Sequence, residues 1–346
     1  MAVYIVDIEA VDTRYTAQWK KYLPQSLKIR SNDHVEVISG GDTPQATTPG
    51  AFLNFGGTNV YKSKQLEIIG EKFCNGEIKD GDYFLYTDAW NPTVIQLRYM
   101  AELLGVNIKI GGLWHAGSYD PQDFLGRLIG DKPWVRQAEV SMYHCYDDNF
   151  FATDFHIELF EKTFGAWTKG HEPKQVGWPM EYLKDIMEPF KGIAKEDIIL
   201  FPHRIAPEKQ PEIFRDLAQS LPQYKFVFAQ DTQLTKDEYH TLLSQSKMVF
   251  SANLQETLGI SWYEAALVNT FPLVPDRLSY SEMATDDVLY PSEWTESWDS
   301  YIAHKQSLIS RIVEIMSRDN TEINNKVIDK VESFFSGDKL YESVLR

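Results

Sequence analysis

Two glutamates, Glu256 and Glu264, lie eight positions apart on either side of Gly259, and their spacing suits a ligand that carries phosphate. If a helix begins near Leu258, Glu256 lies in the loop before the positive end of that helix, and Glu264 lies about two turns inside it. The backbone amides of Leu258, Gly259 and Ile260 are then unpaired at the helix start, where such amides hold phosphates. A diphosphate with a hydroxyl-rich group on each side fits this arrangement, and a nucleotide sugar is such a molecule.

Two cations upstream strengthen this interpretation, because a pair of glutamates alone is more often a solvated surface. Arg204 and Lys209 follow residues 198–201, an apolar run that predicts a buried strand, and residues 211–220 are expected to form a helix. Side chains at the carboxyl end of a parallel strand face the crevice where such sheets bind ligands. A planar guanidinium and a compact ammonium both suit a pyrophosphate.

These motifs resemble the donor site of a known enzyme family. Arg204, Lys209, Glu256 and Glu264 are similar to the donor-binding residues of retaining GT-B glycosyltransferases of the family-four type. The run from Glu256 to residue 282, with the Pro-His-Arg of residues 202–204, most resembles the tRNA-queuosine mannosyltransferase branch. Residues 3–24 are similar to glycosyltransferases of large tailed phages, which modify hydroxymethyl-pyrimidines of DNA. The first resemblance covers residues 198–282, and the second covers only the N-terminus.

The resemblance implies an α/β fold of the GT-B type, with two Rossmann-like, doubly wound domains facing a central cleft. Residues 1–175 are expected to form an acceptor-side domain, residues 176–325 the nucleotide-sugar donor domain, and residues 326–346 a helix that returns toward the first domain. A chain of 346 residues is long for one core, which favours two domains. Strand-like and helix-like segments alternate, which indicates parallel sheets. Strands are expected at residues 2–8, 35–39, 83–86, 107–111, 197–201, 226–229, 248–251 and 271–274, with a further short segment at 141–144.

The resemblance also implies roles for individual residues. Arg204 and Lys209 would hold the donor diphosphate, Glu256 would contact the sugar, and Glu264 would bind the ribose hydroxyls of a UDP- or GDP-linked donor. Thr257, Leu258 and Gly259 would complete the donor site. No metal ion or other cofactor is expected. In such enzymes the incoming hydroxyl attacks from the face of the leaving group and gives its proton to the donor phosphate.

Candidate residues of the first domain follow its expected strands. Two of them, Asp88 and His115, are candidate catalytic residues. Each has a structural alternative, because Asp88 could equally be a strand-end cap and a single histidine is commonly a satisfied structural residue. The acceptor-side candidates are Glu9, Thr13, Arg14, Tyr15 and Trp90. The turn at residues 9–15 has no glycine, unlike the glycine-rich turn that many members of the family carry there.

Other motifs point away from metal and disulfide chemistry. Asp80-Gly81-Asp82 superficially resembles the Asp-x-Asp metal motif of other glycosyltransferases, but it precedes a strand and is interpreted as a turn. The eight histidines show no metal-ligand spacing. The two cysteines, Cys74 and Cys145, are expected to be reduced and structural.

The charge of the chain is strongly negative, with 34 basic and 50 acidic residues and a net charge of −16, which argues against a general nucleic-acid binder. Residues 14–30 are a local exception, with five basic residues, no acidic residue and aromatic residues between them. This stretch predicts either a surface that holds a polynucleotide or a solvated helix face with buried aromatic residues.

Three functions therefore remain open, and the two resemblances together with the basic stretch near Trp19 favour the first. The first is transfer to a modified base in DNA or tRNA, and the second is the same chemistry on a small molecule, lipid or surface glycan. The third is a non-catalytic module that binds nucleotide sugars. No apolar run is long enough to span a bilayer and no basic region precedes the first strand, so we expect a cytoplasmic protein with no membrane partner, in a host cell if the phage resemblance holds. The oligomeric state is not predicted.

Overall fold

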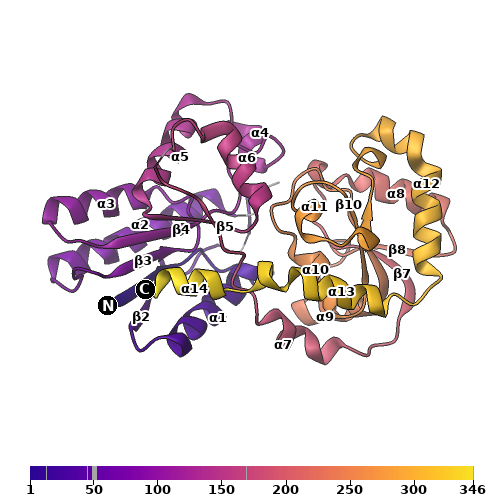
Figure 1. Cartoon of the computed structure of the whole chain (residues 1–346), viewed down its shortest axis with the longest axis horizontal. Coiled ribbons are helices and arrows are strands. Elements are labelled where there is room, and N and C mark those ends of the chain that lie inside the picture. Colours follow the sequence, from indigo (N-terminus) through magenta and orange to yellow (C-terminus); the bar gives the residue numbers. More distant parts are fainter. Residues whose placement is uncertain (13, 45, 49–52, 169, 346) are drawn as a thin grey trace. The chain divides into compact units, whose positions relative to one another are not determined.

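The computed structural model describes residues 1–12, 14–44, 46–48, 53–168 and 170–345. The chain forms two compact units (Figure 1). The first unit comprises Met1–Met180 and Ser336–Arg346, and the second comprises Glu181–Phe335. Each unit contains one parallel sheet with helices packed against it, so the mixed α/β class predicted from the sequence is confirmed.

The first unit has a six-stranded sheet in which every described pairing is parallel. In spatial order its strands are β2 (His34–Ile38), β1 (Ala2–Val6), β3 (Tyr83–Tyr86), β4 (Lys109–Leu113), β5 (Asp148–Phe151) and β6 (Lys174–Gln175). Its helices are α1 (Tyr15–Arg30), α2 (Phe55–Cys74), α3 (Thr93–Leu104), α4 (Phe124–Ile129), α5 (Pro133–Cys145), α6 (Asp154–Phe164) and α14 (Asp338–Val344). The chain winds from β1 outward to β2 and from β3 outward to β4, so the winding reverses between β1 and β3.

The second unit has a five-stranded parallel sheet. Its strands, in spatial order, are β11 (Leu289–Tyr290), β10 (Phe271–Pro275), β9 (Ser246–Phe250), β7 (Glu196–Phe201) and β8 (Lys225–Phe228). Its α-helices are α7 (Leu183–Met187), α8 (Pro211–Ser220), α9 (Lys236–Gln245), α10 (Ile260–Leu267), α11 (Ser279–Met283), α12 (Trp298–Met316) and α13 (Thr321–Val331). Here the winding reverses between β7 and β9.

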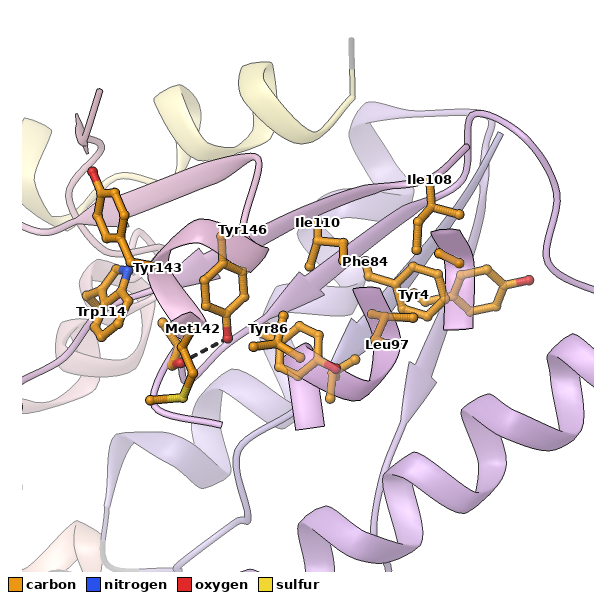
Figure 2. Packing of buried hydrophobic residues seen from close by; sticks show 14 of the residues in the cluster. Tyr4, Phe84, Tyr86, Leu97, Ile108, Ile110, Trp114, Met142, Tyr143 and Tyr146 are labelled. Carbon is orange, nitrogen blue, oxygen red and sulfur yellow. Dashed lines mark hydrogen bonds between the residues drawn. The ribbon is translucent and has the colours of Figure 1, made fainter. Parts of the chain in front are cut away.

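The core of the first unit is rich in aromatic side chains, which Figure 2 shows packed between helices and the sheet. Glycines in β4 make room for them: a Cβ on Gly112 would lie 2.7 Å from the ring of Tyr146. Tyr146 is fully buried and its hydroxyl donates a hydrogen bond to the carbonyl oxygen of Ala89 at 2.9 Å. The tyrosines can therefore be buried because their polar ends find acceptors.

The C-terminal helix α14 packs beside α1 within the first unit (Figure 1). Arg30, in the last turn of α1, lies 3.2 Å from a carboxylate oxygen of Asp338 and 4.4 Å from the ring centroid of Tyr341. Arg30, one of the two basic residues in the last turn of α1, is thus engaged within the fold. Residues 326–346, expected to form one helix, comprise the end of α13, the short 3₁₀ helix η5 (Glu332–Phe335) and α14.

The segment at residues 141–144 is a correction to the sequence prediction, because it lies inside α5 and the strand follows at β5. The buried residues of α5 are Val135, Glu139, Met142 and Tyr143, which is a helical spacing. A window of four residues is too short to distinguish this period from that of a strand.

Lys195, just before β7, is expected to be a large contributor to the stability of the second unit. Its ammonium donates hydrogen bonds to the carbonyl oxygens of Ser244, Ser246 and Val268 at 2.7, 3.0 and 2.9 Å and to the hydroxyl of Thr270 at 2.7 Å. Lys195→Met would remove the donor that these four groups share, although the carbonyl oxygen of Ser246 would keep its hydrogen bond from the hydroxyl of Thr270.

We expect Lys195→Met to lower the free energy of unfolding by about 2–4 kcal/mol in urea denaturation. The matched control is Lys225→Met, at an exposed position of the same sheet. This variant should change the free energy of unfolding by less than about 0.5 kcal/mol. Equal stability of the two variants would contradict a structural role for Lys195.

Candidate functional site

Two loops meet at the carboxyl ends of β7 and β9, where the winding of the second sheet reverses. The amide of Leu254 donates to the carbonyl oxygen of Glu208 at 2.8 Å, and the side-chain amide of Gln210 donates to the carbonyl oxygen of Ala252 at 2.6 Å. These bonds join residues 204–210 to residues 251–259. Open parallel sheets bind their ligands at such a reversal point.

Lys209 ends the 3₁₀ helix η2 (Pro207–Lys209) and is only 6% exposed. Its ammonium donates to the carbonyl oxygen of Gln255 at 2.5 Å and lies 3.4 Å from a carboxylate oxygen of Glu256. The second carboxylate oxygen of Glu256 accepts from the amide of Thr257 at 3.2 Å. The cation and the carboxylate that the sequence associates with a donor are therefore neighbours in space.

Arg204 follows β7 on the same loop, and its guanidinium lies 2.5 Å from a carboxylate oxygen of Glu208. The Glu208 side chain is completely buried, whereas 28% of the Arg204 side chain is exposed. The buried carboxylate thus anchors one side of the guanidinium while part of Arg204 remains accessible to solvent.

Gly259 is the N-cap of α10 and has a φ of +84°, a region that favours glycine. A Cβ here would lie 2.7 Å from Cδ1 of Trp262 and 3.1 Å from the ring of Tyr280, so a larger residue does not fit. No side chain caps the start of α10, so no side chain occupies the amides of its first turn. The helix begins at Ile260 rather than Leu258, so Glu264 lies about one turn inside it, not two.

Glu264 is 2% exposed and makes its polar contacts to α9. The hydroxyl of Tyr239 lies 3.4 Å from one carboxylate oxygen, and the side-chain nitrogens of Lys236 and His240 lie 3.5 and 3.6 Å from the other. Burial acts to raise the pKa of Glu264, but these neighbouring positive and hydrogen-bonding groups lower it overall, so the carboxylate is ionised. Its contacts differ from those of Glu256, which is beside Lys209.

Sequence reasoning missed two buried polar residues beside this pair of loops. Asn253 is fully buried and donates to the hydroxyl of Tyr280 at 3.0 Å, but its Oδ1 has no partner in the described part of the chain. His203 is buried too, and its Nε2 lacks a partner there. Burial and then the charge of Lys209 lower the pKa of His203, which keeps its ring neutral. Unpaired buried groups of this kind leave hydrogen-bonding capacity for a ligand.

Solved structures share the fold of the whole chain. Sucrose-phosphate synthase from Thermosynechococcus elongatus is 10% identical, with 99% of this chain and 96% of that chain covered and a TM-score of 0.63. The catalytic domain of starch synthase IV from Arabidopsis thaliana, bound to ADP and acarbose, is 11% identical, with 99% of both chains covered and a TM-score of 0.59. The Anabaena protein HepE, in complex with UDP-glucose, is 10% identical, with 99% and 98% covered and a TM-score of 0.50. The chain has a GT-B fold. No protein-family model matches the sequence, and no curated protein matches it.

In the first unit of this GT-B fold, Asp88 follows β3 and is held by Lys62. The Lys62 ammonium donates to Asp88 at 3.2 Å and to the carbonyl oxygen of Trp90 at 2.7 Å, and Asp88 accepts from the amide of Trp90 at 3.1 Å. The indole of Trp90 donates to Glu139 at 2.8 Å. In this geometry Asp88 caps the turn after β3. This is the structural role that the sequence offered as an alternative to a catalytic one.

His115 follows β4, and both of its ring nitrogens are engaged. Nε2 donates to the carbonyl oxygen of Thr87 at 2.6 Å, and Nδ1 therefore accepts from the hydroxyl of Tyr15, also at 2.6 Å. The ring packs against Trp178, with 4.7 Å between centroids. Burial lowers the pKa of His115, so the ring is neutral at pH 7. In this arrangement a ligand can bond His115 only by displacing Tyr15 or the carbonyl group.

The remaining acceptor-side candidates lie between β1 and α1. Glu9 is 3% exposed, and neither of its carboxylate oxygens has a partner among the described residues. Arg14 is the N-cap of α1, with its guanidinium 5.7 Å from the ring centroid of Tyr15. Thr13 lies outside the described residues. The structure thus gathers Arg14, Tyr15 and His115, while Asp88 is held with Lys62 and Trp90.

Asp7, which sequence reasoning also missed, directly follows β1 and lies beside Tyr61 and Gln65. Burial raises the pKa of Asp7 from 3.8 to about 6, although a hydrogen bond from Tyr61 opposes this effect. A raised carboxyl pKa means that the folded state binds a proton more tightly than the unfolded state, so this group stabilises the fold as the pH falls from about 6 toward 4.

We expect Asp7→Asn to raise the free energy of unfolding at pH 8, by at most about 3 kcal/mol. This advantage should shrink as the pH falls below about 6. The measurement is urea denaturation of both proteins between pH 5 and pH 8, and an advantage that does not change with pH would contradict the assignment.

Other motifs have structural explanations. The carboxylate of Asp82 accepts from the amides of Ala2 and Lys79 at 2.7 and 2.8 Å, as expected of the turn at Gly81. Among the described residues, no three His, Cys, Asp or Glu side chains gather where they could hold a metal ion. Cys74 and Cys145 are free. Nowhere in the described ranges is there a helix with the length and apolar character needed to span a membrane.

Proposed function

We propose that this protein is a glycosyltransferase that moves a sugar from a nucleotide-diphosphate sugar to a hydroxyl group, with retention of configuration. The observation that supports it best is the Lys209 ammonium, 3.4 Å from Glu256 and joined to the loop that leads into the open start of α10. The Lys209 ammonium and the amides at the start of α10 suit a diphosphate, and the Glu256 carboxylate suits a sugar.

In the proposed reaction Lys209, Arg204 and the amides at Gly259 stabilise the departing diphosphate without a metal ion. Glu256 orients the sugar and stabilises the positive charge that develops on it. The acceptor hydroxyl attacks from the face of the leaving group and passes its proton to the diphosphate. Thr257 and Leu258 line the phosphate site, and Glu264 binds the ribose hydroxyls.

For the acceptor we favour a small molecule or glycan. The basic stretch that suggested a polynucleotide has its central aromatic residue, Trp19, only 2% exposed, and Arg30 is engaged by Asp338. Trp19 therefore has no exposed face on which a base could stack. A modified base in DNA or tRNA, suggested by the queuosine and phage resemblances, is the second candidate, and the exposed Lys20, Lys21 and Lys28 support it.

The proposal is tested with a panel of UDP- and GDP-sugars. We expect one donor to raise the melting temperature and to be slowly hydrolysed to the free nucleotide without an acceptor. Binding without hydrolysis or transfer to any acceptor would instead support a non-catalytic module. The absence of any shift across the panel would refute nucleotide-sugar binding.

Lys209→Ala should weaken donor binding by about 1.5–3 kcal/mol, the usual contribution of a hydrogen bond to a charged group. Isothermal titration of the donor and of the free nucleoside diphosphate measures the loss. It should be similar for both ligands, because Lys209 is assigned to the phosphates and not to the sugar. The control is Lys225→Ala, and unchanged donor affinity in Lys209→Ala would remove Lys209 from the site.

A further inference from the structure

The winding of the first sheet reverses between β1 and β3, and this point has unfilled hydrogen-bonding capacity. The two strand ends are joined there, since the amide of Thr87 donates to the carbonyl oxygen of Val6 at 3.1 Å and the amide of Ile8 donates to the hydroxyl of Thr87 at 2.8 Å. Ligands of open α/β sheets bind at such a point, beyond the carboxyl ends of the strands.

Asp7 follows β1 directly at this point and is 6% exposed. One carboxylate oxygen accepts from the hydroxyl of Tyr61 at 2.5 Å and from the side-chain amide of Gln65 at 3.0 Å. The other, Oδ2, has no partner among the described residues. The fold therefore fixes the orientation of this carboxylate and leaves one of its oxygens unused.

A small cavity of about 10 Å³ borders Asp7, Thr87 and Trp19, with room for one group about the size of a water molecule. Trp19 is 2% exposed, and its indole nitrogen also lacks a partner in the described part of the chain. The cavity is thus bordered by a residue with an unpaired acceptor and a residue with an unpaired donor. A hydroxyl group, which can accept and donate, would satisfy both.

Glu9, two residues after Asp7, adds a second carboxylate with both oxygens unpaired among the described residues. It lies close enough to raise the pKa of Asp7. Two buried carboxylates with unused oxygens are costly unless a ligand supplies hydrogen-bond donors. Lys20 borders the same cavity, and its ammonium offsets part of this negative charge. Hydroxyl groups supply the donors that the carboxylates need.

We propose that Asp7 and Glu9 bind the acceptor, and that the acceptor is a saccharide whose hydroxyl groups donate hydrogen bonds to these two carboxylates. This inference rests on the proposed function. It extends that function by naming the class of acceptor and the two residues that select it.

The test uses the full chain, an active donor from the nucleotide-sugar panel and three groups of acceptors. These are neutral mono- and disaccharides, amino sugars, and hydroxymethylcytosine DNA. We expect transfer to a neutral saccharide. In Asp7→Asn and Glu9→Gln the KM for that saccharide should rise about ten- to hundredfold, while acceptor-independent donor hydrolysis stays within about twofold. Glu67→Gln, at an exposed position on α2, is the control and should behave like the wild type.

Four results would overturn the inference. Transfer to the DNA alone would assign a different acceptor, and transfer to amino sugars alone would mean that the carboxylates select an ammonium group. An unchanged KM in both variants, with their melting temperatures intact, would mean that the unused oxygens hold structural water only. If the wild type neither bound nor hydrolysed any donor, the proposed function itself would fail. If the wild type hydrolysed a donor but neither bound a saccharide nor transferred sugar to one, only this inference would be refuted.

Discussion

Glu256→Gln is expected to lower turnover about 100- to 1000-fold while nucleoside diphosphate affinity stays within about threefold. Glutamine keeps the shape of the side chain and an oxygen that can accept from the amide of Thr257, now at 3.2 Å from Glu256. It loses the negative charge that stabilises a positively charged sugar in the transition state. Because 21% of the Glu256 side chain is exposed, we expect the loss of its charge beside Lys209 to affect folding much less than turnover.

Single-turnover kinetics and titration of the nucleoside diphosphate on the same preparation separate the two effects. Glu293→Gln, at an exposed position of the second unit, is the control and should retain the wild-type rate. Comparable losses of turnover and of nucleotide affinity in Glu256→Gln would show that Glu256 acts on the phosphates or on folding, which would contradict its assignment to the sugar.

The donor loops could be predicted from the sequence because their signals are local. The apolar runs that became β7 and β9 each end in a short polar stretch, and parallel strands bring their carboxyl ends to one edge. Gly259 was predicted near a helix start, and the structure gives it a positive φ at the N-cap of α10. The contact between Lys209 and Glu256 depends on the pairing of β7 with β9. The sequence pattern of a parallel α/β sheet does not specify which strands are neighbours.

The surroundings of other candidates could not be predicted, since they depend on packing between distant segments. The spacing of Glu264 places it on α10 but does not reveal that Tyr239 and Lys236 of α9 lie against it. His115 is engaged by Tyr15, which is 100 residues away in the sequence. Trp19 belongs to a basic stretch by composition, yet the core encloses it because hydrophobic burial outweighs the polarity of its neighbours.

Arg277 is a further example, because nothing in its local sequence distinguishes it from a surface arginine. Its guanidinium donates to the carbonyl oxygens of Asn253, Ala252 and Ser292 at 2.7, 2.8 and 2.9 Å. It also donates to the carbonyl oxygen and the hydroxyl of Thr295 at 3.2 and 3.0 Å. Asn253 and Ala252 belong to the loop that leads to Glu256, so Arg277 holds that loop in place.

Arg277→Met is therefore expected to lower the free energy of unfolding by about 3–5 kcal/mol, since it removes all of these hydrogen bonds and leaves the carbonyl oxygen of Asn253 with no other donor among the described residues. Arg277→Lys should recover little of this loss, because an ammonium cannot span acceptors arranged for a planar fork. The measurements are urea denaturation and donor titration, with the exposed Arg215→Met as the control. We expect donor affinity to fall in Arg277→Met even under conditions where the protein stays folded. Full recovery by lysine would mean that Arg277 contributes only charge, and unchanged donor affinity would mean that the loop of Asn253 keeps its shape without Arg277.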